Sequence, residues 1–508
     1  MATAPSPASD TAFFGHPRGL STLFFTEMWE RFAYYGMRAI LVLFMTASVA
    51  AGGLGFEVGR AGAVYGTYVA LVYMLGLPGG WVADRILGLR RSVFYGGILI
   101  MLGQLSLAVP GAKLFYLGLA FIILGTGLLK PNVSAIVGEL YGQEDTRRDA
   151  GFSIFYMGIN LGAFIAPLIV GWLAQSDTFK GVLEGMGINP ATSWNWGFGV
   201  GALGMFFGVI QYRLGWKHFG DAGIHPSVPA DSEEGRAARR RLGGGFLGLI
   251  AVIAALALMV RQGMISAESI TNGFKWVYLA VVVAFFAWLF LGNSWTKEER
   301  KRLTVIVVLF VGAAIFWSAF EQAATSLNLF AANNTRNSVF GMAFPSSWFQ
   351  SVNALMIIIF APVFAWIWMT LGKHDPSSPA KFGFGLVCVG LGFVVMVGAA
   401  KASAAGVLVS PMWLVATYLL HTIGELSLSP VGLSSMTKLA PDRVKGMMMG
   451  VWFLAASIGN LIAGGVHGFY ATYTLPQVFG AVAAFAIIAG LLMFTLVLPI
   501  KRMMARTD

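Results

Sequence analysis

The sequence has little charge and almost no cysteine. Asp, Glu, Lys and Arg make up 11% of the 508 residues, whereas soluble domains carry about 25%, so the composition argues against a water-soluble globular protein. The one cysteine, Cys388, stands in an apolar stretch without a partner, which excludes an intrachain disulfide and a cysteine metal site. We expect no cleavable signal peptide, because the residues up to Pro17 are polar and the first apolar run is a full span that carries charges. We expect no metal and no organic cofactor.

Long hydrophobic runs dominate the rest of the sequence. Apolar residues make up 57% of the chain, and the mean hydropathy is +0.73. About 20 apolar residues cross a bilayer as a helix, and such runs recur in two groups of six with two more between the groups. They predict an all-α integral membrane protein with 14 transmembrane helices. The first six runs cover 20–47, 58–83, 92–109, 114–138, 150–174 and 194–216, the inserted two cover 243–260 and 274–293, and the last six cover 303–330, 346–371, 382–400, 410–436, 446–471 and 475–499.

This pattern divides the chain into three parts. Residues 1–216 are expected to form an N-terminal six-helix bundle, residues 217–302 a cytoplasmic linker with the two inserted helices, and residues 303–508 a C-terminal six-helix bundle. The stretch 219–241 is rich in Pro, Gly and charge, which predicts a flexible linker. Trp29 and Phe32 recur with the same spacing as Trp317 and Phe320. Such a faint repeat is typical of transporters whose substrate site lies between two bundles.

The basic residues predict the orientation of the helices. An even number of spans puts both termini on one side, and most of the 34 Lys and Arg residues fall in the loops of that side. Because cytoplasmic loops are enriched in Lys and Arg, we expect a multi-pass protein of the cytoplasmic (inner) membrane, in contact with lipid, with both termini in the cytoplasm. The net charge of +11 is spread over many short loops, so it does not indicate nucleic-acid binding.

A charged stripe crosses the first hydrophobic run. Glu27, Glu30, Arg31, Tyr34 and Arg38 follow one another at helical spacing, so they share one face of a helix. Each charge in the middle of a span costs roughly 2.5–3.5 kcal/mol. The stripe therefore favours a pathway for a charged substrate. The alternative is a buried ion-pair network that only locks helices together, but this alternative leaves the tyrosine of the stripe unexplained.

Several motifs carry a resemblance to known transporters. The turn G-W-V-A-D-R-I-L-G-L-R-R at 80–91 resembles the signature loop of the major facilitator superfamily. The segments E-M-W-E-R-F-A-Y-Y-G-M-R (27–38), G-T-G-L-L-K-P-N (125–132), D-A-G-F-S-I-F-Y-M-G-I-N-L-G (149–162) and G-E-L-S-L-S-P-V-G-L-S (424–434) resemble the proton-dependent oligopeptide transporters of bacteria.

The resemblance to this family runs nearly from end to end of the chain. It implies the major facilitator fold, with two six-helix bundles and an extra helix pair between them. It also implies a secondary transporter, not an enzyme, that couples the symport of protons with di- and tripeptides by alternating access. The proton is then the coupling ion.

The residues supply the groups that a zwitterionic peptide needs. Arg38 and Lys130 form a cationic pole within the spans, and Glu321 forms an anionic pole. The resemblance assigns Arg38 and Lys130 to the carboxylate end of the peptide, and it assigns Glu321 with two asparagines to the amine end. The remaining candidates for peptide binding are polar or aromatic: Asn160, Asn353, Tyr34, Tyr35, Tyr73, Trp317, Trp452 and Glu425.

Proton coupling requires carboxylates whose protonation is linked to conformation. The candidates are Glu27 and Glu30, with Arg31 beside them, and Glu321, which we expect to pair with Arg38 and close the site. Protonating an acid in this network would free the arginine for the peptide carboxylate.

The cytoplasmic gate is predicted at a second pair of charges. Glu425 is expected to pair with Lys130, and Pro430 supplies a point where that helix can bend. On the outer side, the stretch 328–336 contains no acid. This leaves contacts of Arg60 with Asn333 or Asn334, or packing alone, to close the outer gate.

The sequence is also compatible with rival functions. Arg38 and Lys130 would suit nitrate or another small anion, and a peptide sensor would bind without transporting. An intramembrane hydrolase fits poorly, because the spans contain no paired metal ligands and no nucleophile with a base at helical spacing. The sequence does not fix the peptide length or side chains preferred, the proton stoichiometry, the order of protonation, the role of the inserted helices or the oligomeric state.

Overall fold

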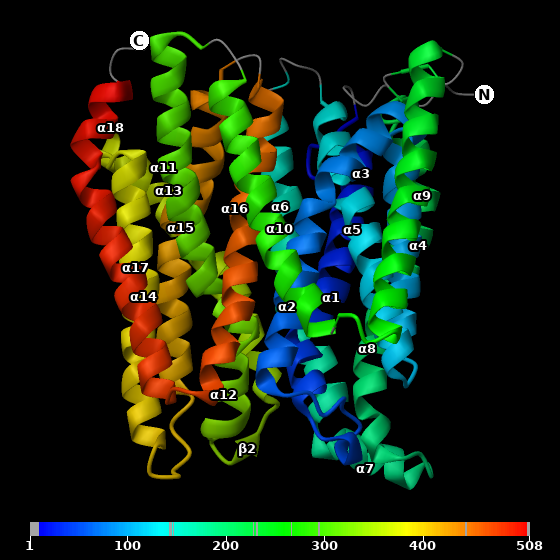
Figure 1. Cartoon of the computed structure of the whole chain (residues 1–508), viewed down its shortest axis with the longest axis vertical. Coiled ribbons are helices and arrows are strands. Elements are labelled where there is room, and N and C mark those ends of the chain that lie inside the picture. Colours follow the sequence, from blue (N-terminus) through cyan, green and yellow to red (C-terminus); the bar gives the residue numbers. More distant parts are fainter. Residues whose placement is uncertain are drawn as a thin grey trace. The chain divides into compact units, whose positions relative to one another are not determined.

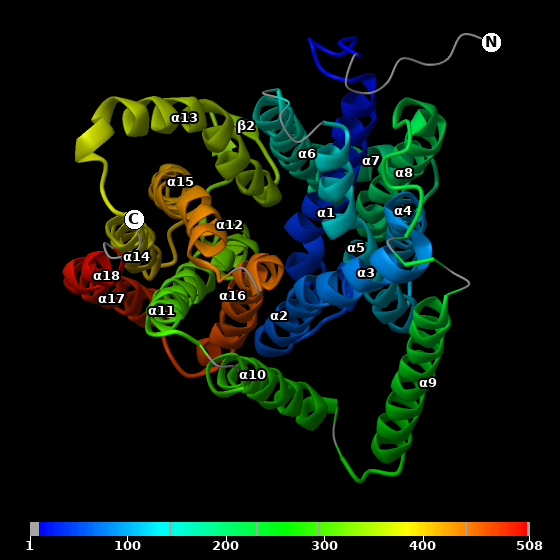
Figure 2. The ribbon, with the colours of Figure 1, turned by 90° about the horizontal axis from the view of Figure 1, so that it is seen from above.

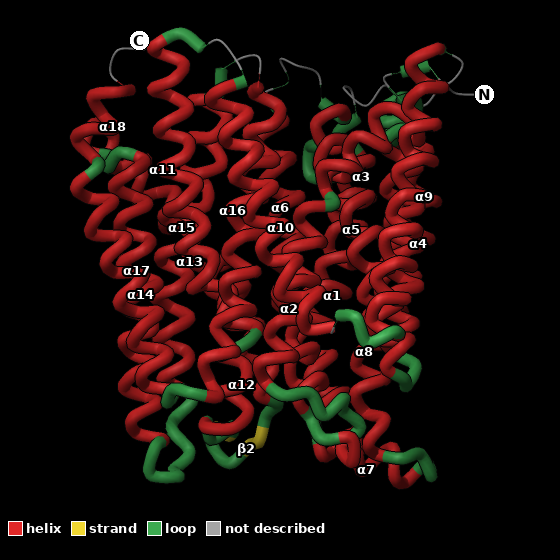
Figure 3. Tube along the Cα trace, viewed as in Figure 1, coloured by secondary structure: helices red, strands yellow, loops and turns green. Residues whose placement is uncertain are grey.

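The protein is almost entirely helical. The computed structural model describes residues 10–141, 145, 147–226, 228–229, 232–265, 267–292, 295–441 and 444–504. Within these residues, the β-strands form one short antiparallel hairpin, in which β1 (Ser338–Val339) pairs with β2 (Met342–Ala343) (Figure 3). The predicted all-α class is therefore confirmed.

The helices of the first half follow the hydrophobic runs closely (Figure 1). The second run is divided, because the helix turns at Leu75 and continues into a π-helical turn at Ala83–Leu87. The short helix α7 was not predicted, since it lies in a polar connection. The elements are α1 (Arg18–Thr46), α2 (Val58–Met74), α3 (Gly76–Val82), α4 (Leu89–Leu107), α5 (Ala112–Glu139), α6 (Arg148–Gln175), α7 (Asp177–Gly185) and α8 (Ser193–Gly215).

The second half agrees in a similar way, except that the predicted span 303–330 is divided by a 3-10 turn at Glu321–Ala324. The inserted pair is α9 (Glu233–Arg261) and α10 (Ala267–Leu291), and α9 begins ten residues before the predicted apolar run because its first turns are charged. The other helices are α11 (Lys297–Phe320), α12 (Ser326–Asn334), α13 (Gln350–Leu371), α14 (Ser378–Ser403), α15 (Met412–Leu439), α16 (Lys445–Val466), α17 (Leu475–Thr495) and α18 (Val497–Met504). In the described residues, nine helices are long and apolar enough to span a membrane, and the count of fourteen stays a prediction.

Contacts within the chain form two compact units. Unit 1 contains residues 1–34, 74–162 and 198–278, and unit 2 contains residues 35–73, 163–197 and 279–508. The helices α1 and α6 therefore each contribute one part to each unit, while α2 lies almost entirely in unit 2. The domain boundaries expected from the sequence are boundaries along the chain, and they stay a prediction.

Close helix contacts in both units depend on small residues. In unit 1, a Cβ atom added at Gly79 of α3 would lie 1.9 Å from the carbonyl oxygen of Gly127 on α5. In unit 2, α14 packs along α17 (Figures 1 and 2), and a Cβ atom added at Gly383 would lie 3.1 Å from the carbonyl oxygen of Gly490. Glycine is suited to such positions because helices in a membrane associate through close backbone packing.

The start of the predicted linker, around Gly220 and Gly223, is held in place by hydrogen bonds, while flexibility of the rest stays a prediction. The backbone N–H of Arg90 donates to the Gly223 carbonyl at 3.0 Å, and Nη2 of Arg90 donates to the Gly220 carbonyl. The N–H of Gly223 in turn donates to Oε2 of Glu139 at 2.7 Å. Composition suggested flexibility, but the linker carbonyls find donors on the end of α4.

Candidate functional site

The acids of the charged stripe on α1 are buried in an ion-pair cluster. Nε of Arg31 lies 3.1 Å from Oε1 of Glu27 and also donates a hydrogen bond to Oε2 of Glu30. The guanidinium carbon of Arg31 lies 5.3 Å from the centre of the Tyr34 ring, within the range of a cation–π interaction. All four side chains are buried in unit 1. The cluster explains how two acids and a base are retained within a span, because each charge has a partner.

Two further predicted residues lie in the same unit. Lys130 on α5, half-buried and next to Pro131, interacts favourably with the carboxylate of Glu27. Asn160 on α6 is buried, and its Nδ2 donates to the Tyr156 carbonyl of the same helix at 3.1 Å. A cationic side chain within a span is suited to bind an anionic group of a substrate.

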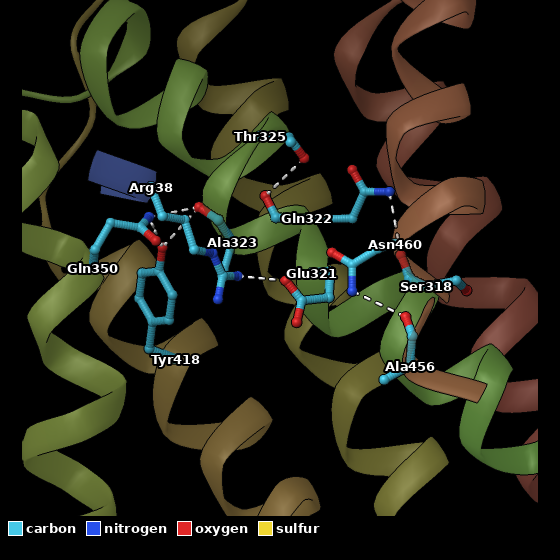
Figure 4. A network of polar contacts seen from close by, with 10 residues as sticks. All are labelled: Arg38, Ser318, Glu321, Gln322, Ala323, Thr325, Gln350, Tyr418, Ala456 and Asn460. Atoms are coloured by element: carbon cyan, nitrogen blue, oxygen red, sulfur yellow. Dashed lines mark hydrogen bonds and ion pairs between the residues drawn. The ribbon is translucent and has the colours of Figure 1, made fainter. Parts of the chain in front are cut away.

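The ion pair between Arg38 and Glu321 lies in unit 2 (Figure 4). Nη2 of Arg38 on α1 lies 2.5 Å from Oε2 of Glu321, which follows directly after α11. The two residues are 8% and 4% exposed. The guanidinium carbon of Arg38 also lies 5.7 Å from the centre of the Tyr35 ring. The structure thus contains the ion pair between Arg38 and Glu321 that was predicted from the sequence.

A break in the helix positions Glu321. The α-helix α11 ends at Phe320, residues Glu321–Ala324 form a single 3-10 turn, and Thr325 leaves the helical region with φ −122° and ψ −92°. The carbonyl of Ala323 in this turn accepts a hydrogen bond of 2.6 Å from Nε2 of Gln350 (Figure 4). A broken helix exposes backbone groups that must be satisfied within the membrane, and the Gln350 amide does this here.

The amide of Gln350 also contacts the ring hydroxyl of Tyr418, at 3.2 Å. Gln322, next to Glu321, donates to the carbonyls of Ser318 and Ala463 at 3.3 and 3.4 Å. Gln350, Tyr418 and Gln322 could not be predicted as site residues from the sequence. Their only signal was a polar side chain inside an apolar run, which is too common to single out a residue.

A second acid of unit 2 is held by an amide. Nδ2 of Asn353 on α13 lies 3.0 Å from Oε2 of Glu425 and 3.0 Å from the hydroxyl of Thr422, both on α15. Pro430 lies inside α15, where it removes one backbone donor. Asn353 and Glu425, which were predicted separately as peptide-binding residues, therefore lie in direct contact. Lys130 belongs to unit 1 and Glu425 to unit 2, so their pairing stays a prediction.

The predicted aromatic residues of unit 2 are packed against other rings. Tyr73 stacks on Phe453 with ring centres 6.3 Å apart, and Trp317 lies edge-on to Phe320 at 5.3 Å. Trp452 is buried, and a Cβ atom added at Gly432 would lie 2.2 Å from its ring. These contacts fix the orientation of the rings. Whether each ring touches a substrate stays a prediction.

The donor set of the site suits an organic zwitterion better than a metal. In the part of the chain that the structure describes, no group of three or more His, Cys, Asp and Glu side chains is arranged to hold a metal ion. The groups in contact within each unit are instead guanidinium, carboxylate and amide groups. This fold and this site define a membrane transporter with the major facilitator fold.

Comparisons with known proteins identify the family. The profile of the POT family (PTR2) matches residues 90–484. The chain is 43% identical to the peptide transporter YePEPT of Yersinia enterocolitica over 522 residues, which cover 100% of this chain and 99% of that relative. It is 38% identical to a di-/tripeptide transporter of Lactococcus lactis subsp. cremoris over 512 residues, which cover 98% of both.

Solved structures agree with the sequence comparisons. A peptide transporter POT in complex with sulfate matches with a TM-score of 0.87 at 43% identity, covering 97% of this chain and 96% of that chain. A POT family transporter in complex with 5-aminolevulinic acid matches with a TM-score of 0.88 at 34% identity, covering 97% and 99%. The chain therefore belongs to the POT family. It is a secondary transporter and not an enzyme.

Proposed function

We propose that this chain imports di- and tripeptides together with protons by alternating access. It acts in the cytoplasmic membrane with both termini in the cytoplasm, and it needs no cofactor besides the coupling proton. The observation that carries the proposal is the buried ion pair between Arg38 and Glu321. The names of relatives that match along the whole chain, such as the di-/tripeptide transporter of Lactococcus lactis, support the substrate class.

The ion pair supplies a physical reason for coupling. Removing one partner from a buried ion pair leaves an uncompensated charge, which costs about 3–5 kcal/mol. Arg38 can therefore leave Glu321 only if another anion takes its place and if the charge of Glu321 is neutralised. A peptide carboxylate meets the first requirement and a proton on Glu321 meets the second. Neither ligand alone makes the exchange favourable, so peptide and proton move together.

The remaining candidates extend this site. Lys130 shares the peptide carboxylate with Arg38, while Asn160 and Asn353 bind the amine end together with Glu321. Glu27, Glu30 and Arg31 form the second proton-responsive cluster. The Tyr and Trp side chains at 34, 35, 73, 317 and 452 line the space for the peptide and its side chains. Lys130, Glu425 and Pro430 form the cytoplasmic gate, and Glu425 also contributes to binding.

Uptake into liposomes tests the proposal. The purified protein is reconstituted, and labelled dialanine is supplied outside with and without a pH gradient that is acidic outside. We expect accumulation above the outside concentration only with the gradient, and competition by unlabelled dialanine but not by nitrate. Binding without accumulation would favour a sensor, and competition by nitrate would favour an anion transporter. Either result would overturn the proposal.

A further inference from the structure

A buried asparagine holds α1 directly beside the coupling ion pair. Asn328 on α12 is fully buried, and its Nδ2 donates a hydrogen bond of 2.7 Å to the carbonyl oxygen of Ala39. Ala39 is the residue after Arg38. The Asn328 side chain therefore binds the backbone of α1 next to the arginine that pairs with Glu321. All of these residues belong to unit 2.

The two attachments lie on opposite sides of the helix break. Glu321 begins the 3-10 turn that follows α11, whereas Asn328 lies in the first turn of α12, beyond the break at Thr325. The ion pair of Arg38 and the hydrogen bond from the Asn328 amide to Ala39 therefore connect consecutive residues of α1 to two separate helical segments. As long as both contacts exist, α11 and α12 are held in one arrangement against α1.

Burying the Asn328 side chain costs folding free energy, because part of the amide is left without a hydrogen bond. Within the described residues, its Oδ1 has no hydrogen-bond partner. The Ala39 carbonyl lies inside α1, where the helix supplies its own donor. A leucine would thus remove an unsatisfied oxygen without stranding an acceptor, so folding alone gives little reason for the amide.

Two similar contacts lie in the same unit. The hydroxyl of Ser351 on α13 donates to the Phe164 carbonyl of α6 at 2.7 Å, and the hydroxyl of Ser457 on α16 donates to the Ala70 carbonyl of α2 at 2.9 Å. In all three contacts, an uncharged side chain from the second half of the chain binds a backbone carbonyl of the first half. The sequence 328–336, which contains no acid, agrees with a closure of this kind.

We propose that Asn328 is a positioning residue that stabilises the outward-closed state. By holding the Ala39 carbonyl, it keeps Arg38 in reach of Glu321 and keeps α12 against α1 on the side that the basic residues predict to be outside. A hydrogen bond without charge is suited to this role, because it can be broken and remade in each transport cycle at small cost. The inference rests on the proposed role of the Arg38–Glu321 pair.

Labelling of a single cysteine from outside the cell tests this role. Cys388 is the only cysteine and is buried, so Cys388→Ser gives a clean background. Ala331→Cys is the reporter: Ala331 is fully buried on α12, three residues after Asn328 and so on the same face. A membrane-impermeant maleimide added to intact cells reacts with the reporter only when the outer side opens.

We expect Asn328→Leu to raise the labelling rate about fivefold, the shift in population expected from one neutral hydrogen bond. The matched control is Thr335→Val, which removes a buried hydrogen bond of the same segment, from Thr335 to the Phe330 carbonyl, without touching α1. It should leave the labelling rate unchanged. Thermal unfolding of the purified Asn328→Leu protein should also be unchanged, because no buried group loses its only partner.

Two outcomes would overturn the inference. Labelling of Asn328→Leu at the parent rate would show that the amide does not stabilise closure, and an equal increase with Thr335→Val would show general loosening of α12. If Asn328→Leu does not accumulate in the membrane, Asn328→Ser takes its place with the same expectation, since its side chain is too short to reach Ala39. Labelling requires no substrate, so a failure of peptide uptake would not affect this result.

Discussion

Arg38 and Glu321 stand 283 residues apart in the chain, yet they form a buried ion pair with Nη2 and Oε2 2.5 Å apart. The arginine comes from the first helix and the acid from the break after α11. In the proposed function, closure of the site depends on the charge of this carboxylate. We therefore propose this contact as the one through which a proton acts on the conformation.

The first prediction concerns this carboxylate. Glu321→Gln keeps the shape and polarity of the side chain but removes its charge and its ability to bind a proton. We expect proton-driven accumulation of dialanine to fall by about tenfold or more, which lies within the usual range of coupling energies. Exchange of labelled for unlabelled dialanine, without a gradient, should remain measurable. Full accumulation under a pH gradient in this variant would contradict the coupling role of Glu321.

The second prediction concerns the cytoplasmic gate. Lys130→Glu and Glu425→Lys each place two like charges where we expect an ion pair, so each should reduce dialanine uptake strongly. The double variant restores opposite charges, and we expect its uptake to exceed that of either single variant by about tenfold, as direct coupling between neighbours would produce. Uptake in the double variant no better than in the single variants would argue against direct pairing.

Most of the fold could be predicted from the sequence because the membrane imposes a simple rule. A span must be predominantly apolar over about 20 residues, so the hydrophobic runs marked most of the helices to within a few residues. Where the rule does not apply, the prediction was incomplete. The charged start of α9 and the polar helix α7 lie outside apolar runs, and composition alone suggested a flexible linker where Arg90 binds its carbonyls.

The candidate site divides in the same way. Arg38 and Glu321 could be predicted because a charge in a span is costly and needs a reason. Gln350 and Asn328 could not, because a neutral amide in a span costs less and occurs for many reasons. Their roles depend on which backbone carbonyl each one meets, namely Ala323 and Ala39. Contacts between distant segments of this kind appear only in the folded chain.

The third prediction tests the amide that holds Glu425. Asn353→Leu removes the hydrogen bonds to Glu425 and Thr422, and hydrogen bonds to charged groups are the stronger ones. We expect the KM for dialanine to rise by about tenfold, with a smaller change in the maximal rate, because binding to the site is weakened. The measurement is the initial rate of uptake over a range of dialanine concentrations.

The control for this prediction is Thr422→Val, which leaves the bond between Asn353 and Glu425 in place. Its KM should change by about fivefold at most, the effect of one neutral hydrogen bond. If Thr422→Val raised the KM as much as Asn353→Leu, the amide would serve to join α13 and α15, and not to position the acid.

The fourth prediction separates the coupling acids from an acid outside the membrane. Asp145, between α5 and α6, accepts hydrogen bonds from Nε and Nη2 of Arg147 at 3.0 and 2.8 Å. These hydrogen bonds lower the pKa of Asp145 from 3.8 to about 2. A carboxyl whose pKa is lower in the folded protein contributes stability above its ordinary pKa, and this stability is lost as the pH falls toward the lower value.

The charge of Asp145 therefore does not change between about pH 5 and pH 8, the range in which uptake is measured. We expect Asp145→Asn to show the same dependence of dialanine uptake on pH as the parent protein, whatever the change in overall rate. Glu321→Gln, measured in parallel, should lose most of that dependence. A displaced pH profile in Asp145→Asn would mean that this ion pair acts on the coupling acids, because a fixed charge moves the midpoint only by shifting the pKa of a titrating group.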